Sequence, residues 1–339
     1  MIRVEYIWID GTKPTPQLRG KTKFITDFAE RMNDWIFDGS STYQAVNLGT
    51  DCILRPVKTY IDPRYKLAFI VLCEVYNING TPHSTNTRRK LVEICNEEEV
   101  KAADPVVGFE QEYFIMQGPG RPLGFPKDIN SYPPPQGPYY CGVGGDRAFG
   151  RNIADAHAND CIETEISICG VNAEVAPGQW EYQIGGPDVD IIKACDDLWV
   201  SRYLLMRHTE GGYFISLEQK PVAGDWNGSG MHTNFSTIKM RMAGGIEEIE
   251  KACEKLSKRV QQHLDTYGHG YESRLTGKHE TARYDKFSWG VSDRAASVRI
   301  PYNVARDGCG YFEDRRPGAN ADPYRVAHIM IDTVVMSGT

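Results

Sequence analysis

Two glutamates inside an otherwise apolar stretch constrain the fold of this chain more than any other feature. The segment 106–116 is predicted to be a β-strand, and Glu110 and Glu112 lie two positions apart in its Phe-Glu-Gln-Glu-Tyr-Phe core, residues 109–114. Alternate residues of a strand share a face, so the two carboxylates lie a few ångström apart. Like charges that close repel, and the pKa of one carboxyl rises unless a cation lies between them. Considered alone, the segment fits a solvent-facing edge strand equally well.

A second acidic segment repeats this pattern. Residues 172–182, Asn-Ala-Glu-Val-Ala-Pro-Gly-Gln-Trp-Glu-Tyr, place Glu174 and Glu181 among apolar residues, with Trp180 beside the second carboxylate. A tryptophan in that position is difficult to accommodate on a plain surface. Hard divalent cations prefer oxygen ligands, so four carboxylates in such settings indicate a site for Mg²⁺ or Mn²⁺.

A glycine-rich turn leading into a strand adds a histidine. Within residues 226–236, the side chains of His232, Asn234 and Ser236 share one strand face. A lone histidine is more often a satisfied core residue than a ligand, but among several carboxylates an imidazole completes a site that accepts Mn²⁺. A charged cluster such as residues 311–317 is usually a solvated turn. Here guanidinium groups that match phosphate oxygens could instead clamp a phosphate, namely those of Arg294, Arg299 and Arg315.

The usual nucleotide-binding signatures are absent from the sequence. Gly277-Lys278 is not part of a phosphate-binding P-loop, because Glu272 takes the place of the required glycine five positions before Gly277. No complete GxGxxG follows a predicted strand, and neither an HExxH motif nor a GxSxG nucleophile elbow occurs. If a nucleotide binds, metal ions rather than a glycine-rich loop must hold its phosphates.

Charge and composition exclude other classes of function. The 339 residues include 38 Lys and Arg against 45 Asp and Glu, a net charge of −7, without a basic run. We therefore expect no nucleic-acid partner and no membrane partner. The longest apolar run, residues 67–73, is far shorter than the roughly 20 residues of a transmembrane helix. The nine cysteines include no CxxC pair, which indicates free thiols in a reducing compartment, the cytoplasm.

The pattern along the chain is mixed α and β. Alternation over residues 4–9 and a β-branched run over 66–76 predict strands, each followed by a turn. Residues 87–100 show apolar spacing along one helical side. The change in composition near residues 80–88 indicates a boundary between a small β-rich domain and a large α+β domain.

The second part of the chain contains a long loop and several helices. Residues 118–145 are rich in Pro, Gly and Tyr, and such a long loop is uncommon unless it is functional. Helical periodicity occurs over 146–169 and 188–208, and most clearly over 245–267. A terminal helix is predicted after Pro323, which suits a first helical turn.

Seven separated segments together resemble glutamine synthetase of the eukaryotic type, over nearly the full length and in the order of that family. One such motif is weak, but seven in order are highly specific. The segments are Trp-Ile-Phe-Asp-Gly-Ser-Ser-Thr at 35–42, Gly-Phe-Glu-Gln-Glu-Tyr at 108–113, and those at 172–181, 227–236, 274–281, 293–301 and 310–317. The sequence begins almost directly at the first predicted strand, so we expect it to lack the N-terminal helical arm usual in eukaryotic members.

The resemblance implies an α+β fold and a ligase. An N-terminal β-grasp domain would span residues 1–84, and a catalytic domain with a curved antiparallel sheet carrying the metal site would span residues 85–339. The family forms glutamine from glutamate, ammonium and ATP through γ-glutamyl phosphate. The resemblance also implies a homo-oligomer with shared active sites, a decamer of two pentameric rings.

The matching motifs also imply roles for individual residues. The active site would bind two or three Mg²⁺ or Mn²⁺ ions. One ion would be held by Glu112, His232 and Glu313, and a second, near the γ-phosphate, by Glu110, Glu174 and Glu181. Glutamate would be bound by Asn227, Gly228, His232, Arg274 and Arg315. ATP would be bound by Asn234, Ser236, Arg299 and Tyr311, with Arg294 on the transferring phosphate. Asp38 from a neighbouring subunit, together with Glu280, would take up ammonium and remove its proton.

Two other interpretations compete with this one. A ligase that adds glutamate to another amine keeps the metal and phosphate residues but need not keep the ammonium carboxylates. Asp38 and Glu280, both in matching motifs, therefore favour ammonia. A structural protein that reuses the fold should have lost metal ligands, and all six candidates are present.

Overall fold

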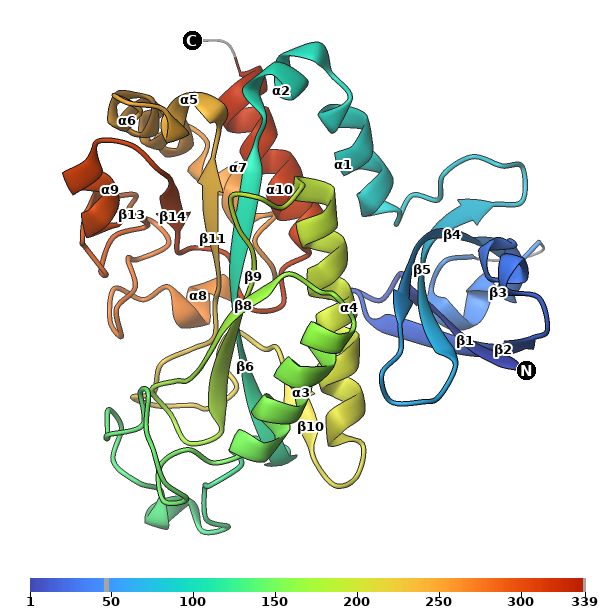
Figure 1. Cartoon of the computed structure of the whole chain (residues 1–339). Coiled ribbons are helices and arrows are strands. Elements are labelled where there is room, and N and C mark those ends of the chain that lie inside the picture. Colours follow the sequence, from blue (N-terminus) through green and yellow to red (C-terminus); the bar gives the residue numbers. More distant parts are fainter. Residues whose placement is uncertain (46–48, 338–339) are drawn as a thin grey trace.

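Two β-sheets form the framework of the computed structural model, which describes residues 1–45 and 49–337 (Figure 1). The smaller sheet has the strand order β2-β1-β5-β4-β3. Its β1 and β5 are parallel, and its other pairs are antiparallel. Two short 3-10 turns, η1 (Phe28–Met32) and η2 (Gly39–Thr42), flank β3. The strands are β1 (Ile2–Ile9), β2 (Leu18–Ile25), β3 (Trp35–Asp38), β4 (Asp51–Ile61) and β5 (Ala68–Asn77).

The larger sheet has nine strands and carries the residues of interest. Its main order is β12-β13-β14-β11-β6-β9-β8, and β7 and β10 also pair with β6. The pairs are antiparallel except for β12 with β13, which is parallel. The strands are β6 (Val106–Gly118), β7 (Arg121–Pro122), β8 (Ile168–Ala173), β9 (Gln179–Gly185), β10 (Phe214–Ser216), β11 (Met231–Ser236), β12 (Trp289–Val291), β13 (Val298–Ile300) and β14 (Phe312–Asp314).

Helices surround the larger sheet, and α4 packs between it and the smaller sheet (Figure 1). None of the helices in the described residues is long and apolar enough to cross a membrane. Two further short elements are the 3-10 turn η3 (Ile129–Ser131) and the π-helical turn η4 (Asp332–Met336). The helices are α1 (Thr87–Cys95), α2 (Glu98–Ala103), α3 (Arg151–Glu163), α4 (Ile191–Thr209), α5 (Ile238–Arg241), α6 (Ile246–Ser257), α7 (Val260–Leu264), α8 (Tyr271–Arg274), α9 (Tyr302–Asp307) and α10 (Pro323–Ile331).

Buried polar contacts join the smaller sheet to the helices of the larger one. The hydroxyl of Tyr60 on β4 donates to Asp197 on α4 at 2.9 Å. Arg88 on α1 bridges Glu74 on β5 and Asp196 on α4, at 2.8 Å to each carboxylate. Paired in this way, the charges tolerate burial and fix the orientation of the small sheet relative to α4.

The α+β class predicted from the sequence is confirmed, but several element bounds differ. The helix predicted over 146–169 begins only after Gly150, whose φ of +87° belongs to a turn, and residues 168–173 join the sheet as β8. The helix predicted over 245–267 is two helices, because Arg259 leaves the helical conformation at φ −125° and ψ 26°. The domain boundary at 84/85 lies in the connection between β5 and α1 and stays a prediction.

Candidate active site

Six side chains predicted as metal ligands gather on neighbouring strands of the larger sheet. β6 is the central strand of this group, because β11 pairs with one of its edges and β9 with the other. The six side chains are Glu110 and Glu112 on β6, Glu181 on β9, His232 on β11, Glu313 on β14 and Glu174 directly after β8.

The ligand atoms form two groups, and within each group they lie within 4.8 Å of one another. The groups are Glu110, His232 and Glu313, and Glu112, Glu174 and Glu181. This grouping exchanges Glu110 and Glu112 relative to the predicted allocation, which placed Glu112 with His232 and Glu110 with Glu181. The register of the strands explains the exchange, because His232 lies opposite Glu110 and Glu181 lies opposite Glu112.

The electrostatics of both groups favour a cation. Burial is the largest cause that raises the pKa of Glu112 to about 7, of Glu174 to about 8 and of Glu181 to about 9, and repulsion from neighbouring carboxylates adds to each rise. Burial, together with the positive charge of Arg315, lowers the pKa of His232 to about 3, so its imidazole is neutral. Carboxylates and one neutral imidazole fit Mg²⁺ or Mn²⁺.

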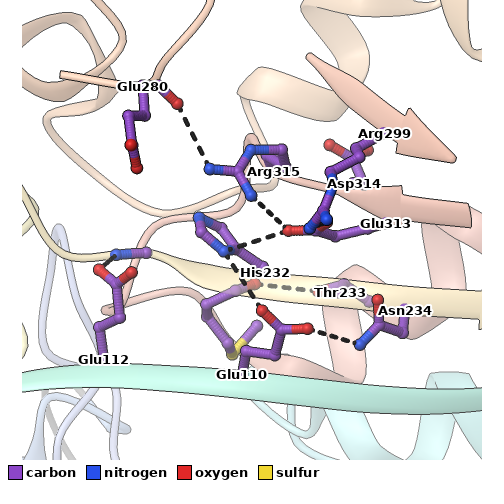
Figure 2. Close-up of polar contacts among 12 residues, drawn as sticks. Glu110, Glu112, His232, Thr233, Asn234, Glu280, Arg299, Glu313, Asp314 and Arg315 are labelled. Atoms are coloured by element: carbon purple, nitrogen blue, oxygen red, sulfur yellow. Dashed lines mark hydrogen bonds and ion pairs between the residues drawn. The ribbon is translucent and has the colours of Figure 1, made fainter. Parts of the chain in front are cut away.

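Arginines surround the group that contains Glu313. Arg315 donates Nη1 to Glu313 at 2.6 Å, and Arg299 donates Nη1 to the other carboxylate oxygen at 3.1 Å (Figure 2). The Nη2 of Arg315 also contacts the carbonyl oxygen of Glu280 at 3.4 Å. Nη1 of Arg294 lies 3.4 Å from the Glu280 carboxylate. Within the described part of the chain, the buried Nε atoms of Arg299 and Arg315 have no hydrogen-bond partner.

Two cavities meet at these strands. One, of about 250 Å³, is lined by all six candidate ligands and by Asn227, Gly228, Arg274, Glu280, Arg294, Arg299 and Arg315. The other, of about 530 Å³, is lined by Asn234, Ser236 and Tyr311 among others. Glu110 borders both cavities. The smaller cavity suits a small polar ligand, and the larger one has the size of typical cofactor pockets.

Two residues predicted to bind the substrate glutamate, Arg274 and Gly228, are also held in place by their own structural contacts. Arg274 is buried and donates Nη2 to the carbonyl oxygens of Arg316 at 2.6 Å and Pro317 at 3.0 Å. A Cβ on Gly228 would lie 2.2 Å from the carbonyl oxygen of Gln219, so only glycine fits this turn.

Asp38 lies outside both cavities. It ends β3, the edge strand of the smaller sheet, away from the strands that carry the metal ligands (Figure 1). Its side chain is exposed and accepts hydrogen bonds from the Ser40 amide at 3.0 Å and hydroxyl at 2.7 Å. These bonds lower the pKa of Asp38, which keeps the carboxylate ionised. Within one chain, the structure does not bring Asp38 and Glu280 together.

Several residues that line the cavity of about 250 Å³, called the acidic cavity below, were not predicted from the sequence, among them Tyr140 and His279. Tyr140 lines the acidic cavity, and the guanidinium carbon of Arg294 lies 6.0 Å from the centre of the Tyr140 ring. His279, also on the wall, places Nε2 3.2 Å from a carboxylate oxygen of Asp225. The only signal for Tyr140 was its place in the long loop 118–145, which carried a functional expectation but did not single out a residue.

Comparison with known proteins identifies the family to which the chain is similar. The family model for the glutamine synthetase catalytic domain matches residues 84–264. The chain is similar to a glutamine synthetase of Streptomyces viridochromogenes, with 50% identity over 98% of this chain and 96% of that protein. It is also similar to a cytosolic isozyme of glutamine synthetase from Pinus sylvestris, with 46% identity over 98% and 93% of the two chains. A cryo-EM structure of Plasmodium falciparum glutamine synthetase has the same fold, with a TM-score of 0.81 at 16% identity over 98% of this chain and 71% of that one.

Proposed function

This chain belongs to the glutamine synthetase family, and on that premise we propose that its two acidic groups and the flanking arginines join glutamate to ammonia at the expense of ATP. The chain is a ligase that forms glutamine, with γ-glutamyl phosphate as the intermediate. The observation that carries the assignment to this site is the pair of metal-ligand groups at the junction of a small polar cavity and a larger one.

The two cavities support separate places for the substrates. In our proposal glutamate occupies the smaller cavity and the nucleotide the larger one, so phosphoryl transfer takes place beside Glu110, which borders both. The residues proposed to bind the substrate glutamate are Asn227, Gly228, His232, Arg274 and Arg315. The residues proposed to bind the nucleotide are Asn234, Ser236, Arg299 and Tyr311, and Arg294 would contact the phosphate that is transferred.

The metal ligands are proposed to be the two groups as the structure arranges them, for two or three Mg²⁺ or Mn²⁺ ions per site. When bound, such cations neutralise charge on the phosphates and on the transferred phosphoryl group. The residues themselves contribute a fixed arrangement, because strand pairing sets the spacing of their donor atoms before any ion arrives.

The arginines provide the remaining positive charge. The carboxylate of glutamate is a poor electrophile, and phosphorylation gives it a leaving group. Arg299 and Arg315 are already oriented by Glu313, so they need little rearrangement to stabilise charge on the transferred group.

Ammonium must lose a proton before it can attack. We assign that proton to the carboxylate of Glu280, with Asp38 of another copy of the chain helping to bind the cation. The contact between Glu280 and Arg294 supports this role, because it keeps the exposed carboxylate at the mouth of the acidic cavity. Closing Glu280 over the site also protects the acyl phosphate from water.

The exposed position of Asp38 supports active sites that are shared between copies. The small sheet and the acidic cavity lie apart in one chain, so the carboxylate reaches a cavity only in an oligomer. We propose a homo-oligomer that forms a ring, and from the family resemblance a decamer of two pentameric rings.

Mixing Asp38→Ala with Glu181→Ala protomers should restore activity, because some sites then combine an intact Asp38 with an intact metal site. In a randomly reassembled 1:1 mixture, about a quarter of the sites have both halves intact. The measurement is glutamine formation after dissociation and reassembly of the mixture. Each variant taken through the same steps alone is the control, and mixtures as inactive as their parents would exclude shared sites.

Product analysis with ATP, glutamate and a panel of amines tests the proposed function. We expect ammonium to be the preferred amine, with phosphate released only when glutamate is present. Methylamine and larger amines should react poorly, since the acidic cavity of about 250 Å³ leaves little space beside bound glutamate. A larger amine that reacts faster than ammonium would identify the chain as a different glutamate ligase.

A cytoplasmic location is also proposed. All nine cysteines are free in the structure, and five of them are buried. Free thiols persist in reducing compartments, which supports the assignment.

A further inference from the structure

Strand β14 presents polar side chains on both of its faces. Glu313 and Arg315 line the acidic cavity, whereas the alternate residues Asp314 and Arg316 are buried on the opposite side. Asp314 accepts hydrogen bonds from the Arg316 main-chain N at 3.0 Å, from its Nε at 2.9 Å and from its Nη2 at 2.5 Å. The proposed function does not use this second face.

A chain of buried hydrogen bonds continues from Asp314 to the C-terminal turn. The hydroxyl of Tyr267 donates to Asp314 Oδ2 at 2.8 Å, and Nδ1 of His263 lies 2.5 Å from the same hydroxyl. Nε2 of His263 lies 2.8 Å from Oγ1 of Thr333, which belongs to η4. All four side chains in this series of hydrogen bonds are fully buried, namely Asp314, Tyr267, His263 and Thr333.

The partners determine where the protons lie. The single proton of the Tyr267 hydroxyl goes to Asp314, so His263 must donate from Nδ1 to Tyr267. Nε2 then carries a lone pair and accepts from the Thr333 hydroxyl. Burial, with the positive charge of Arg316, lowers the pKa of His263 to about 3, in agreement with a neutral ring. Each bond therefore depends on the next, and no group has a spare proton.

We propose that Thr333, His263 and Tyr267 are positioning residues for the metal and glutamate site, acting through Asp314. β14 is only three residues long, with three paired positions on β11 and two on β13. Side chains alternate along a strand. The hydrogen bond from Tyr267 to Asp314 on one face therefore fixes the direction in which Glu313 and Arg315 point on the other face. Through this chain, the C-terminal turn η4 sets the geometry of an active-site wall. The inference rests on the proposed function.

Thr333→Val tests the proposal, because it removes the first donor of the chain and keeps the shape of the side chain. We expect Mn²⁺ affinity and kcat/KM for glutamate to fall about 10-fold, the lower end of the range for losing an outer partner of a metal ligand, because Thr333 acts through three intervening side chains. The KM for ATP should change less than the KM for glutamate, because the proposed nucleotide residue Ser236 pairs with Val106 on β6 and not with β14. Hydrogen exchange at the Arg315 amide, which bonds to Ser297 at 2.9 Å, should become faster.

Two variants separate positioning from general stability. Thr333→Ser keeps the hydroxyl and should restore Mn²⁺ affinity. Thr209→Val removes a buried threonine hydroxyl that bonds only to the Met206 carbonyl within the described residues, and it should leave Mn²⁺ affinity at the wild-type value. If Thr333→Val does not fold, Tyr267→Phe removes the hydroxyl next to Asp314 and is measured in its place, with the same expected losses.

The outcomes distinguish this inference from the proposed function. A folded Thr333→Val or Tyr267→Phe protein with wild-type Mn²⁺ affinity and glutamate KM would overturn the inference, even if its melting temperature were lower. Failure of the wild-type protein to bind Mn²⁺ or to form glutamine would contradict the proposed function instead.

Discussion

Glutamine formation and glutamate-dependent phosphate release should both cease in excess EDTA and return when Mg²⁺ or Mn²⁺ is restored. The acidic groups contain five carboxylates and one imidazole, and without cations they repel both one another and the phosphates of ATP. Glu181→Gln should lower kcat by about 10²–10³-fold, comparable to the loss of a preorganised electrostatic contact in other active sites. Both activities are measured under saturating ATP and glutamate.

The Glu181→Gln variant also separates function from folding. Glu181 is buried beside Glu112 and Glu174, so the glutamine removes repulsion from the metal-free protein, and its melting temperature should stay equal or rise. Glu254→Gln, at an exposed position on α6, is the matched control and should retain full activity. Turnover that persists in EDTA, or a Glu181→Gln protein as active as the control, would contradict the metal site.

The local chemistry of the site could be predicted from the sequence because it depends on short-range periodicity. Glu110 and Glu112 share a face for the simple reason that strands have a period of two. The division of the six candidate metal ligands into two groups could not be predicted from this periodicity. It depends on which residue of β11 lies opposite which residue of β6, and a two-residue change in register would place His232 opposite Glu112 instead of Glu110.

The helix bounds show a similar limit. Apolar spacing continues from α6 into α7, but the main chain leaves the helix at Arg259, whose Nη2 pairs with Asp332 at 2.6 Å. That partner lies 73 residues further along the chain. Tertiary contacts of this kind override local periodicity and leave no local signal. Tyr140 was missed for a related reason, since its position beside Arg294 depends on the path of a long loop.

Asp38→Asn should reduce glutamine formation by about 10²–10⁴-fold, the range for loss of a group that assists proton removal. The reason is charge, since an amide neither attracts ammonium nor helps to take its proton. ATP binding and the metal-dependent steps should change little, because Asp38 does not line the cavities of its own chain. Asp34→Asn, at an exposed position in the same region and paired with Arg55 at 3.1 Å, is the control.

Asparagine is the informative replacement because it separates the charge of Asp38 from its structural role. Asp38 caps η2 by accepting from the Ser40 amide, and asparagine caps helices about as well as aspartate, so the small sheet should keep its fold. Hydroxylamine is neutral and nucleophilic at pH 7 and needs no carboxylate to capture a cation. The variant should therefore make γ-glutamylhydroxamate much better than glutamine, relative to wild type. If both products fall by the same factor, the role of Asp38 is structural and ammonium is bound elsewhere.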